Sequence, residues 1–406
     1  MSKKVKISIF IGVVAIFCVV LLIIANNLGI SLENAVQIEL ADMNTTVNGQ
    51  PISNSKDEAV YLSNDLIYSG EEDAFIHSVI HISQPGVYAL SGTLAYGQVA
   101  VDLGEKAYDD KNAVVTLILN NANINCSVAP AIIFNNVYEC SSTKQSQSDV
   151  NTKKAGANIY IANDSVNNIK GSYNALNNDN GALCSKMSIN IGGKDDAILN
   201  VVGENEGIHT DMHLTVNGGS ISVASKSTGI IANNKEKSVI TINKSSLKVD
   251  IVNNLKDKVT AIKSNGWITV NNGQLIASTN DVNGSYSLDA DKGIIINGGT
   301  LKASGNKIGN ILKSKQNYAI FNFASKKTGG SLYALKNKKG ETVIEYNPFN
   351  NFSTLIISDG KLKKGNYTFT NNMSSLEATK GGLTDKKTDI FGIVKGENCF
   401  NFVSEI

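Results

Sequence analysis

Apolar and polar residues alternate along most of this chain, and between residues 207 and 305 the alternation recurs four times in one form. Each copy has a short alternating run, a corner that contains Asn, and a second alternating run, as in Leu214–Val216, Asn217 and Ser220–Ala224. The corner residues Asn217, Asn243, Asn271 and Asn297 recur at intervals of 26, 28 and 26 residues. A period of this length, carried by strands instead of helices, predicts an all-β solenoid of stacked turns.

Matching positions in the four copies indicate which side chains face inward. Ile208, Ile230, Ile262 and Leu288 occupy the same place in successive copies, so we expect one inward ladder of apolar side chains. Successive turns of a parallel solenoid lie about 4.8 Å apart, and the alternate residues then form flat outward faces and a groove across the turns. Such faces suit a long repetitive polymer, because each turn can contact the next unit of the chain.

Period-two alternation begins at Val79 and continues through Gln98–Leu103, Val114–Leu119 and Asn158–Ile161, with a polar loop predicted at Ser141–Lys154. No amphipathic helix is predicted in this part, which excludes helical solenoids and Rossmann-like folds. After Gly309 the spacing changes, and short turns join the predicted strands. These strands suit a C-terminal antiparallel β cap over the open end of the stack, and they span Tyr318–Ala324, Ser331–Leu335, Thr342–Tyr346, Ser353–Ile357 and Tyr367–Thr370.

The N-terminus predicts one transmembrane helix. Lys3, Lys4 and Lys6 precede the uncharged run Ile7–Ala25, which is long enough to cross a hydrocarbon core of ~30 Å. Basic residues on its N-terminal side keep that end inside, so we expect a single-pass protein of the cell membrane with its ectodomain outside. A cleaved signal peptide, which would make the protein secreted, is the alternative. The expected organisation is an anchor or signal at 1–30, a stalk and N-terminal edge at 31–75, a parallel β-helix at 76–310 and a C-terminal cap region at 311–406.

Composition narrows the class of partner. The formal net charge is +1, all 37 basic residues are Lys, and no basic run occurs beyond the N-terminus, so nucleic acid is not an expected partner. Asn supplies 51 of the 406 residues, which suits a fold with many tight corners. Cys126, Cys140, Cys184 and Cys399 match no disulfide framework; a disulfide is one possibility, and small buried cysteines inside the solenoid are the other. We expect a monomer.

Several segments resemble a bacterial, often clostridial, family of exported carbohydrate-binding proteins. The resemblance covers about residue 79 to about residue 375, and it depends on the order and spacing of segments such as Gly86–Leu94, Gln98–Asp102, Gly207–Asp211 and Ser287–Asp291. It implies a right-handed parallel β-helix similar to family 9 pectate lyases. It also implies binding of polysaccharide, either acidic and pectin-like or cellulose, and calcium held by aspartates at Asp-Gly-Ile corners.

The chain departs from that pattern at the corners. The first copy has Glu206, but Thr228, Thr260 and Tyr286 stand at the equivalent places of the next three. The remaining candidates for calcium are Glu206, Asp211, Asp281, Asp289 and Asp291, and a hard cation needs six to eight oxygen ligands. Asp289 and Asp291 share one strand face, where they hold calcium, contact sugar or cap a turn beside Gly293.

His209, Asp211 and His213 alternate along one predicted strand face. Imidazoles with a carboxylate are ligands that zinc accepts, although three residues of a single strand more often form a solvated polar face.

Trp267 is the only tryptophan, and it begins a predicted strand beside Gly266. An exposed indole is a natural platform for a sugar ring, and Tyr286 is expected to extend it; packing between turns is the alternative role of Trp267. Lys263 and Lys292 complete the candidate ligand-binding residues. In a lyase such a Lys acts as the base, yet an unperturbed Lys titrates near 10.4 and is a poor base at neutral pH.

Three functions fit these observations. The first is an extracellular, membrane-anchored protein that binds polysaccharide without cleaving it, so no catalytic residue is assigned. The second is a calcium-dependent polysaccharide lyase on the same fold. The third is a structural or adhesive surface protein that binds the cell wall or other proteins.

Overall fold

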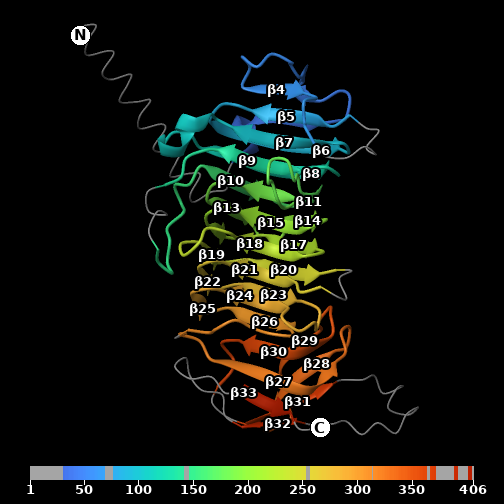
Figure 1. The fold of residues 1–406 in the computed structure, drawn as a ribbon, viewed down its shortest axis with the longest axis vertical. Coiled ribbons are helices and arrows are strands. Elements are labelled where there is room, and N and C mark those ends of the chain that lie inside the picture. Colours follow the sequence, from blue (N-terminus) through green and yellow to red (C-terminus); the bar gives the residue numbers. More distant parts are fainter. Residues whose placement is uncertain are drawn as a thin grey trace, which may run out of the picture.

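The chain folds into stacked β-strands with almost no helix (Figure 1). The computed structural model describes residues 31–68, 76–140, 146–252, 257–312, 314–363, 366–371, 388–391 and 401–404. The helical elements in these ranges are two short 3-10 helices, η1 (Leu32–Asn34) and η2 (Glu105–Asp109). The expectation of an all-β fold is confirmed.

Three columns of parallel strands make up the stack, and the chain visits them in a fixed order, turn after turn. The first column contains β10 (Ala157–Ile161), β13 (Ile189–Gly193), β16 (Leu214–Val216), β19 (Val239–Ile242), β22 (Trp267–Val270) and β25 (Gly293–Ile296). The second column contains β11 (Val166–Gly171), β14 (Ile198–Gly203), β17 (Ser220–Ser225), β20 (Ser246–Ile251), β23 (Gln274–Ser278) and β26 (Thr300–Gly305).

The third column is a nine-stranded sheet of its own. From its N-terminal end it contains β4 (Val60–Ser63), β5 (Ser78–Ile82), β7 (Gly97–Asp102), β9 (Ile132–Asn136), β12 (Leu183–Ser185), β15 (Glu206–Thr210), β18 (Thr228–Ala232), β21 (Thr260–Ser264) and β24 (Tyr286–Ala290). Every pair in it is parallel except β4 with β5, which is antiparallel.

Two long strands, β6 (Gly86–Leu94) and β8 (Val115–Asn125), lie near the N-terminal end of the stack, and β8 pairs with strands of both the first and the second column. Shorter strands close the end itself. β1 (Val36–Leu40) lies parallel on β6, and the antiparallel strands β2 (Thr46–Val47) and β3 (Gln50–Pro51) follow it. Short edge strands of this kind limit pairing with other chains.

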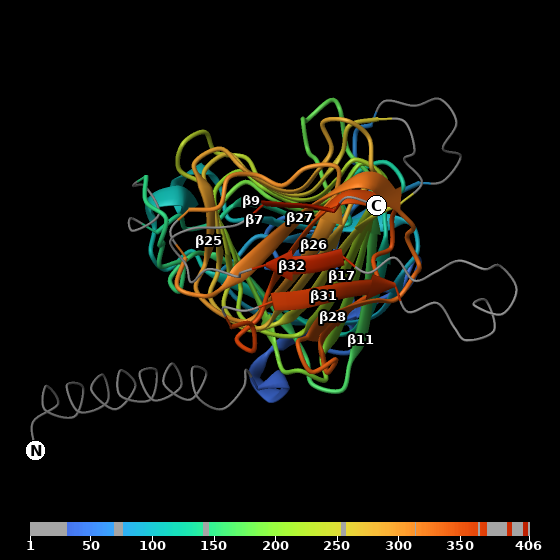
Figure 2. The same ribbon diagram turned by 90° about the horizontal axis from the view of Figure 1, so that it is seen from below.

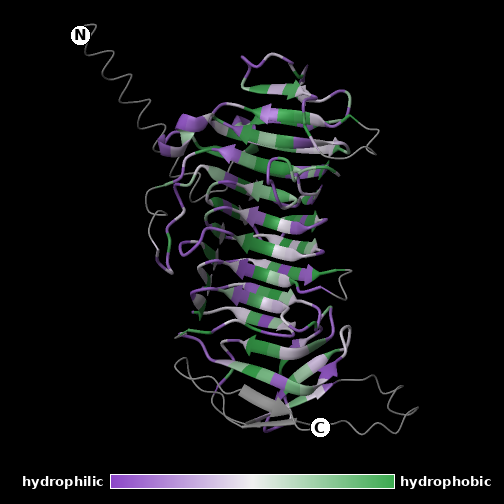
Figure 3. Cartoon of the chain, viewed as in Figure 1, coloured by the Kyte–Doolittle hydropathy of each residue, from purple (hydrophilic) through white to green (hydrophobic). Residues whose placement is uncertain are grey.

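The register confirms the predicted alignment of the four copies. Ile208 pairs with Ile230, Ile230 with Ile262, and Ile262 with Leu288, and each of these side chains is at most 1% exposed. They belong to a cluster of buried apolar residues that runs through the stack from Ile38 to Ile356. Full burial of each such side chain contributes about 1.5–3 kcal/mol, so the periodic apolar residues account for the stacking. Figure 3 shows the corresponding alternation of apolar and polar segments along the strands.

The corner asparagines form a ladder that follows the same register. The side-chain amide of Asn243 donates to Oδ1 of Asn217 at 2.9 Å, that of Asn271 to Asn243 at 2.8 Å, and that of Asn297 to Asn271 at 2.7 Å. Each Asn therefore bonds the same residue one turn away, which fixes the stagger of successive corners.

Antiparallel strands follow the stack, as the sequence predicts (Figure 1). β27 (Tyr318–Lys327) and β30 (Phe352–Ser358) pair antiparallel with each other, and β30 also pairs antiparallel with β26; β33 (Asn401–Ser404) lies parallel to β27. A separate antiparallel sheet contains β28 (Tyr333–Asn337), β29 (Thr342–Tyr346), β31 (Asn366–Asn371) and β32 (Thr388–Phe391). Aromatic rings pack between these strands, including those of Phe321, Phe323, Tyr333, Phe352 and Phe369.

No helix among the described residues is both long and apolar enough to span a bilayer. The predicted anchor Ile7–Ala25 and Cys399 lie outside the described residues. Cys126, Cys140 and Cys184 are buried as thiols, in agreement with the prediction of small buried cysteines. Burial raises the pKa of the Cys184 thiol to about 12, so this cysteine stays protonated.

Candidate functional site

The outward side of the first column is covered by the segment Ser146–Ala155. Thr152 Oγ1 donates to Oδ1 of Asn190 at 2.6 Å and lies 2.7 Å from Oγ1 of Thr215. Further along, Thr269 Oγ1 donates to the Ser148 carbonyl at 3.1 Å. Thr215 and Thr269 are consequently buried, and this face is closed to a large ligand over these turns.

The N-terminal half of the third column is also covered. Outward side chains of β5, β7, β9 and β12 form a small buried cluster of Val79, Ala100, Ile133 and Cys184, and Leu66 packs on it. The segment around Leu66 is tied down further on, where the Asn174 amide donates to the Ile67 carbonyl at 2.7 Å. An apolar outward patch is thus shielded by a segment that lies between β4 and β5 in sequence.

The C-terminal half of the third column, from β15 to β24, presents polar side chains outward, and we call it the open face. Two rows of residues in register cross it, and a third row follows the strand ends. The rows are Glu206, Thr228, Thr260 and Tyr286; His209, Ile231, Lys263 and Asp289; and Asp211, Asn233, Asn265 and Asp291. Loops project on either side of the third column when the molecule is seen along the stack (Figure 2).

The second column also keeps an exposed outer side, but its chemistry differs. Val166, Ile198 and Val202 are exposed there. The neighbouring amides bond one another, since Asn200 donates to Asn168 at 2.9 Å and Asn168 donates to Asn123 at 2.6 Å. These amides lie between exposed apolar side chains, whereas most side chains in the rows of the open face are polar.

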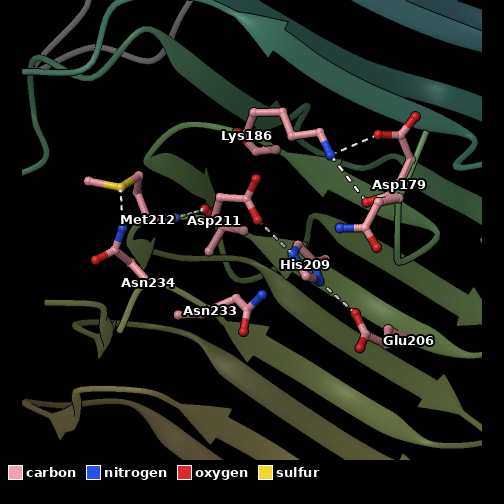
Figure 4. A network of polar contacts seen from close by, with 12 residues as sticks. Asp179, Lys186, Glu206, His209, Asp211, Met212, Asn233 and Asn234 are labelled. Atoms are coloured by element: carbon pink, nitrogen blue, oxygen red, sulfur yellow. Dashed lines mark hydrogen bonds and ion pairs between the residues drawn. The ribbon is translucent and has the colours of Figure 1, made fainter. Parts of the chain in front are cut away.

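A buried imidazole between two carboxylates marks the beginning of the open face (Figure 4). His209 Nδ1 lies 2.6 Å from Oε2 of Glu206, and Nε2 lies 3.0 Å from Oδ1 of Asp211. Burial by itself lowers the pKa of His209, but the hydrogen bonds to Asp211 and Glu206 outweigh it and raise the pKa to about 9. His209 is therefore a cation at neutral pH, and both of its nitrogens are engaged.

An ion pair lies beside this network (Figure 4). Lys186 Nζ is 2.8 Å from Oδ1 of Asp179 and also donates to the Asn178 carbonyl at 3.3 Å. Burial opposes the charged form of Lys186, yet the hydrogen bond to Asp179 prevails and the pKa of the lysine is raised. Together with Glu206, His209 and Asp211, the pair leaves one net negative charge at this end of the open face.

At the other end, Lys263 pairs in register with Asp289. Burial raises the pKa of the Asp289 carboxyl, with Lys263 acting against the shift and Asp291 adding to it. Asp291 and Lys292 are exposed immediately after β24. The predicted residues Lys263, Asp289, Asp291 and Lys292 are thus brought to one place.

The two aromatic candidates do not lie together. Trp267 begins β22 in the first column, half-buried between Val239 and Gly293 of the adjacent turns. Tyr286 begins β24, in register with Thr260 at the start of β21. The whole of β21 therefore separates the two aromatic positions, and Tyr286 does not extend a platform from Trp267. Whether Trp267 stacks on sugar stays a prediction.

The five candidate calcium ligands are divided over three places. Glu206 and Asp211 bond to His209, whereas Asp281 accepts from Ser353 at 2.6 Å and lies 3.5 Å from Lys326 Nζ. The third place holds Asp289 and Asp291, at the end of the open face near Lys263. Within the described ranges, no three His, Cys, Asp or Glu side chains form a group that could hold a metal ion. The acids therefore do not fit one calcium site, and Asp281 anchors the C-terminal strands instead.

The array of His209, Asp211 and His213, for which zinc was the alternative role, is not assembled either. β15 ends at Thr210, so the alternation does not continue to His213, which is buried and accepts the backbone N–H of Val239 at 3.0 Å. The alternative of a solvated polar face is wrong for both imidazoles, since His209 is 4% and His213 is 1% exposed.

Sequence reasoning missed the Asp179–Lys186 pair and the row position of Asn233 and Asn265. Asn265 donates to Asn233 at 3.0 Å, and both follow third-column strands. The position immediately after each strand end was the available signal, because it repeats from Asp211 to Asp291.

The fold and its open face define an all-β protein of stacked parallel strands with a largely polar outer face. The model of the carbohydrate-binding domain-containing protein family matches residues 76–363, well over half of the chain. The chain therefore belongs to this family, which confirms the resemblance at that level.

A solved structure, described as the polysaccharide lyase-like protein from C. thermocellum in a gadolinium derivative, is similar with a TM-score of 0.49 and 19% identity. The similarity covers 69% of this chain and 97% of that one. The comparison with curated proteins gives no match.

Proposed function

We propose that this protein binds polysaccharide on the open face, from β15 to β24, without cleaving it. The carrying observation is that this face presents rows of mostly polar side chains one strand apart, interrupted by the buried Ile231, while segments of the same chain cover the first column and the N-terminal half of the third. Adjacent strands lie about 4.8 Å apart, so a repetitive chain across them meets similar groups at each step. Family membership supports the ligand class.

The scaffold of this proposal is a right-handed parallel β-helix. Three strands per turn, parallel pairing between turns and a continuous apolar interior support it. Right-handed connection of parallel strands is the general rule in proteins.

The ligand is either an acidic, pectin-like polysaccharide or cellulose. Lys263 and Lys292 suit a carboxylate, whereas the asparagines and threonines of the rows suit neutral hydroxyls. For an acidic ligand, the proposal includes a calcium ion that Asp289 and Asp291 hold against the carboxylate of the sugar. Two carboxylates alone make a weak site, so calcium is not part of the proposal for a neutral ligand.

A lyase on the same fold is the second candidate, and the open face argues against it. A general base must be deprotonated at working pH. His209 holds its proton up to a pKa of about 9 and both nitrogens are occupied, while Lys263 faces Asp289. Formation of unsaturated uronate from polygalacturonate, followed by ultraviolet absorbance with and without calcium, tests this directly; appreciable product refutes the binding-only proposal.

We place the binding domain outside the cell as a monomer, tethered by Ile7–Ala25 or released if that segment is cleaved. A structural or adhesive role, with protein or cell wall as partner, is the remaining alternative. Absence of binding to every glycan tested favours it.

Affinity electrophoresis on polygalacturonate and sedimentation with cellulose test the proposal with two matched variants. Thr260→Gln adds uncharged bulk to the open face, and Ser222→Gln adds slightly more uncharged bulk to the second column, where Ser222 is exposed. We expect Thr260→Gln to weaken binding several-fold and Ser222→Gln to bind like the wild type. The reverse result moves the site to the second column.

A further inference from the structure

A cavity of about 440 Å³ lies where the stack meets the C-terminal strands. The chain after β26 makes one more partial turn: Lys307 donates its N–H to the Ser285 carbonyl at 2.9 Å, and Ser287 donates to the Lys307 carbonyl at 3.0 Å. The chain then leaves for β27, while Thr354 of β30 donates to the Asn306 carbonyl at 2.7 Å. The cavity is the space that the unfinished turn leaves above β27 and β30, and its volume is within the ~300–1,000 Å³ of ligand pockets.

The lining combines aromatic, amide and cationic groups. Its aromatic and polar members are Tyr286, Tyr318, Asn306, Asn310, Asn322, Thr354 and Lys307. Sugars are bound by such sets, since rings contact their C–H faces and amides bond their hydroxyls.

Several of these polar groups are available to a ligand. Within the described residues, Lys307 makes no ion pair, the side chain of Asn310 makes no hydrogen bond, and Asn322 uses only its Oδ1, which accepts from Thr354 at 3.3 Å. No Asp or Glu of the described chain lines the cavity. Among the described residues that line the cavity, only Lys307 is charged, and its positive charge complements a carboxylate.

The cavity continues the open face. Tyr286 is the last residue of the row that begins at Glu206, and it also lines the cavity. Lys307 forms a parallel bridge with Tyr286, so it takes the next position of the same row. A glycan that follows this row across β18 and β21 reaches the cavity at its next step.

We propose that this cavity is a separate subsite for one acidic sugar unit, whose carboxylate is held by Lys307 and whose ring contacts Tyr286. The inference rests on the proposed polysaccharide binding and adds a charge-selective position to it. Lys307 is exposed, so its substitution leaves the fold intact.

Isothermal titration calorimetry of the full chain tests the subsite with trigalacturonate and with its carboxyl-reduced, neutral counterpart. We expect the wild type to bind the acidic trisaccharide about tenfold more tightly, because a charge-assisted hydrogen bond is lost in the neutral one. Lys307→Gln should abolish this preference by weakening the acidic ligand alone. Lys338→Gln, an exposed lysine of the β28–β29 turn, is the matched control and should behave like the wild type.

The outcomes separate this subsite from the proposed function. If polygalacturonate retards the wild type but trigalacturonate binds no better than its neutral counterpart, or if Lys307→Gln retains the preference, the subsite is refuted and the open face stands. If Lys307→Gln loses the preference while Thr260→Gln leaves polymer binding unchanged, the subsite stands and the open face is refuted.

Discussion

His209 is the residue whose chemistry the fold changes most. Its pKa rises from 6.5 to about 9 because two carboxylates hold the protonated ring in a buried place. A pKa raised in the folded state contributes stability that is complete below about 6.5 and is lost as pH rises through about 9, and the shift corresponds to on the order of 3 kcal/mol. We therefore expect the free energy of unfolding to fall between these pH values, measured by urea titration at each pH.

Two variants check this assignment. His209→Gln should remove most of the fall on the alkaline side. His81→Gln should leave it in place, because burial lowers the pKa of His81 and its effect on stability lies at acid pH. An unchanged alkaline slope in His209→Gln would show that another group titrates there.

At the scale of single elements, the asparagine ladder offers a comparison between an inner and an end position. Asn271 bonds Asn243 and Asn297, at 2.8 and 2.7 Å, whereas Asn297 has only the bond to Asn271 in this ladder. Each bond contributes about 0.5–1.5 kcal/mol, so Asn271→Ala should cost roughly twice as much unfolding free energy as Asn297→Ala. Denaturant titration of both variants measures this. Equal losses would mean that the corners are held by their backbone alone.

The segment around Leu66 is a second element with a measurable role. Leu66 packs on the buried cluster that contains Cys184, whose pKa is raised to about 12 by burial. Leu66→Ala should open this cover and increase the modification rate of Cys184 by about tenfold or more, because thiolate content and access both rise. Mass spectrometry resolves each cysteine, and Cys126 in the main core is an internal reference. Leu176→Ala, at a 57% exposed position, is the control; an equal effect there would refute the covering role.

These elements show how far the sequence could predict the structure. Alternation and period placed Ile208, Ile230, Ile262 and Leu288 in one buried row, because both are consequences of strand geometry. Nothing in the alternation or the period of the sequence indicates that a side chain on the outward side of a strand will be buried. Cys184 is buried in a cluster on which Leu66 of an earlier segment packs, and only the folded chain shows which segments return to the stack. His209 is held by Glu206 and Asp211 of its own segment, a contact that strand alternation alone does not indicate. The zinc array failed for a related reason, since alternation holds only while the strand lasts.

At the scale of the whole molecule, the C-terminal strands do more than close the stack. Asn350 reaches back to donate to the Ile251 carbonyl at 2.9 Å, and its N–H donates to Ser278 at 3.0 Å. Asp281, which the sequence offered as a metal ligand, accepts from Ser353 of β30. These contacts hold the cap against the last turns, and they shape the cavity beside Tyr286.

The length of the open face makes a last prediction about ligand size. β15 and β24 are three strand spacings apart, or about 14 Å, and the cavity adds one further step. If sugars contact successive rows, affinity should rise with each unit added to an oligosaccharide until the chain spans from β15 to the cavity, and then stay constant. Calorimetry with size-fractionated oligogalacturonates and cello-oligosaccharides measures this series. An affinity that is already constant from the disaccharide onward would mean that one subsite binds the polymer and that the rows on the open face contribute nothing.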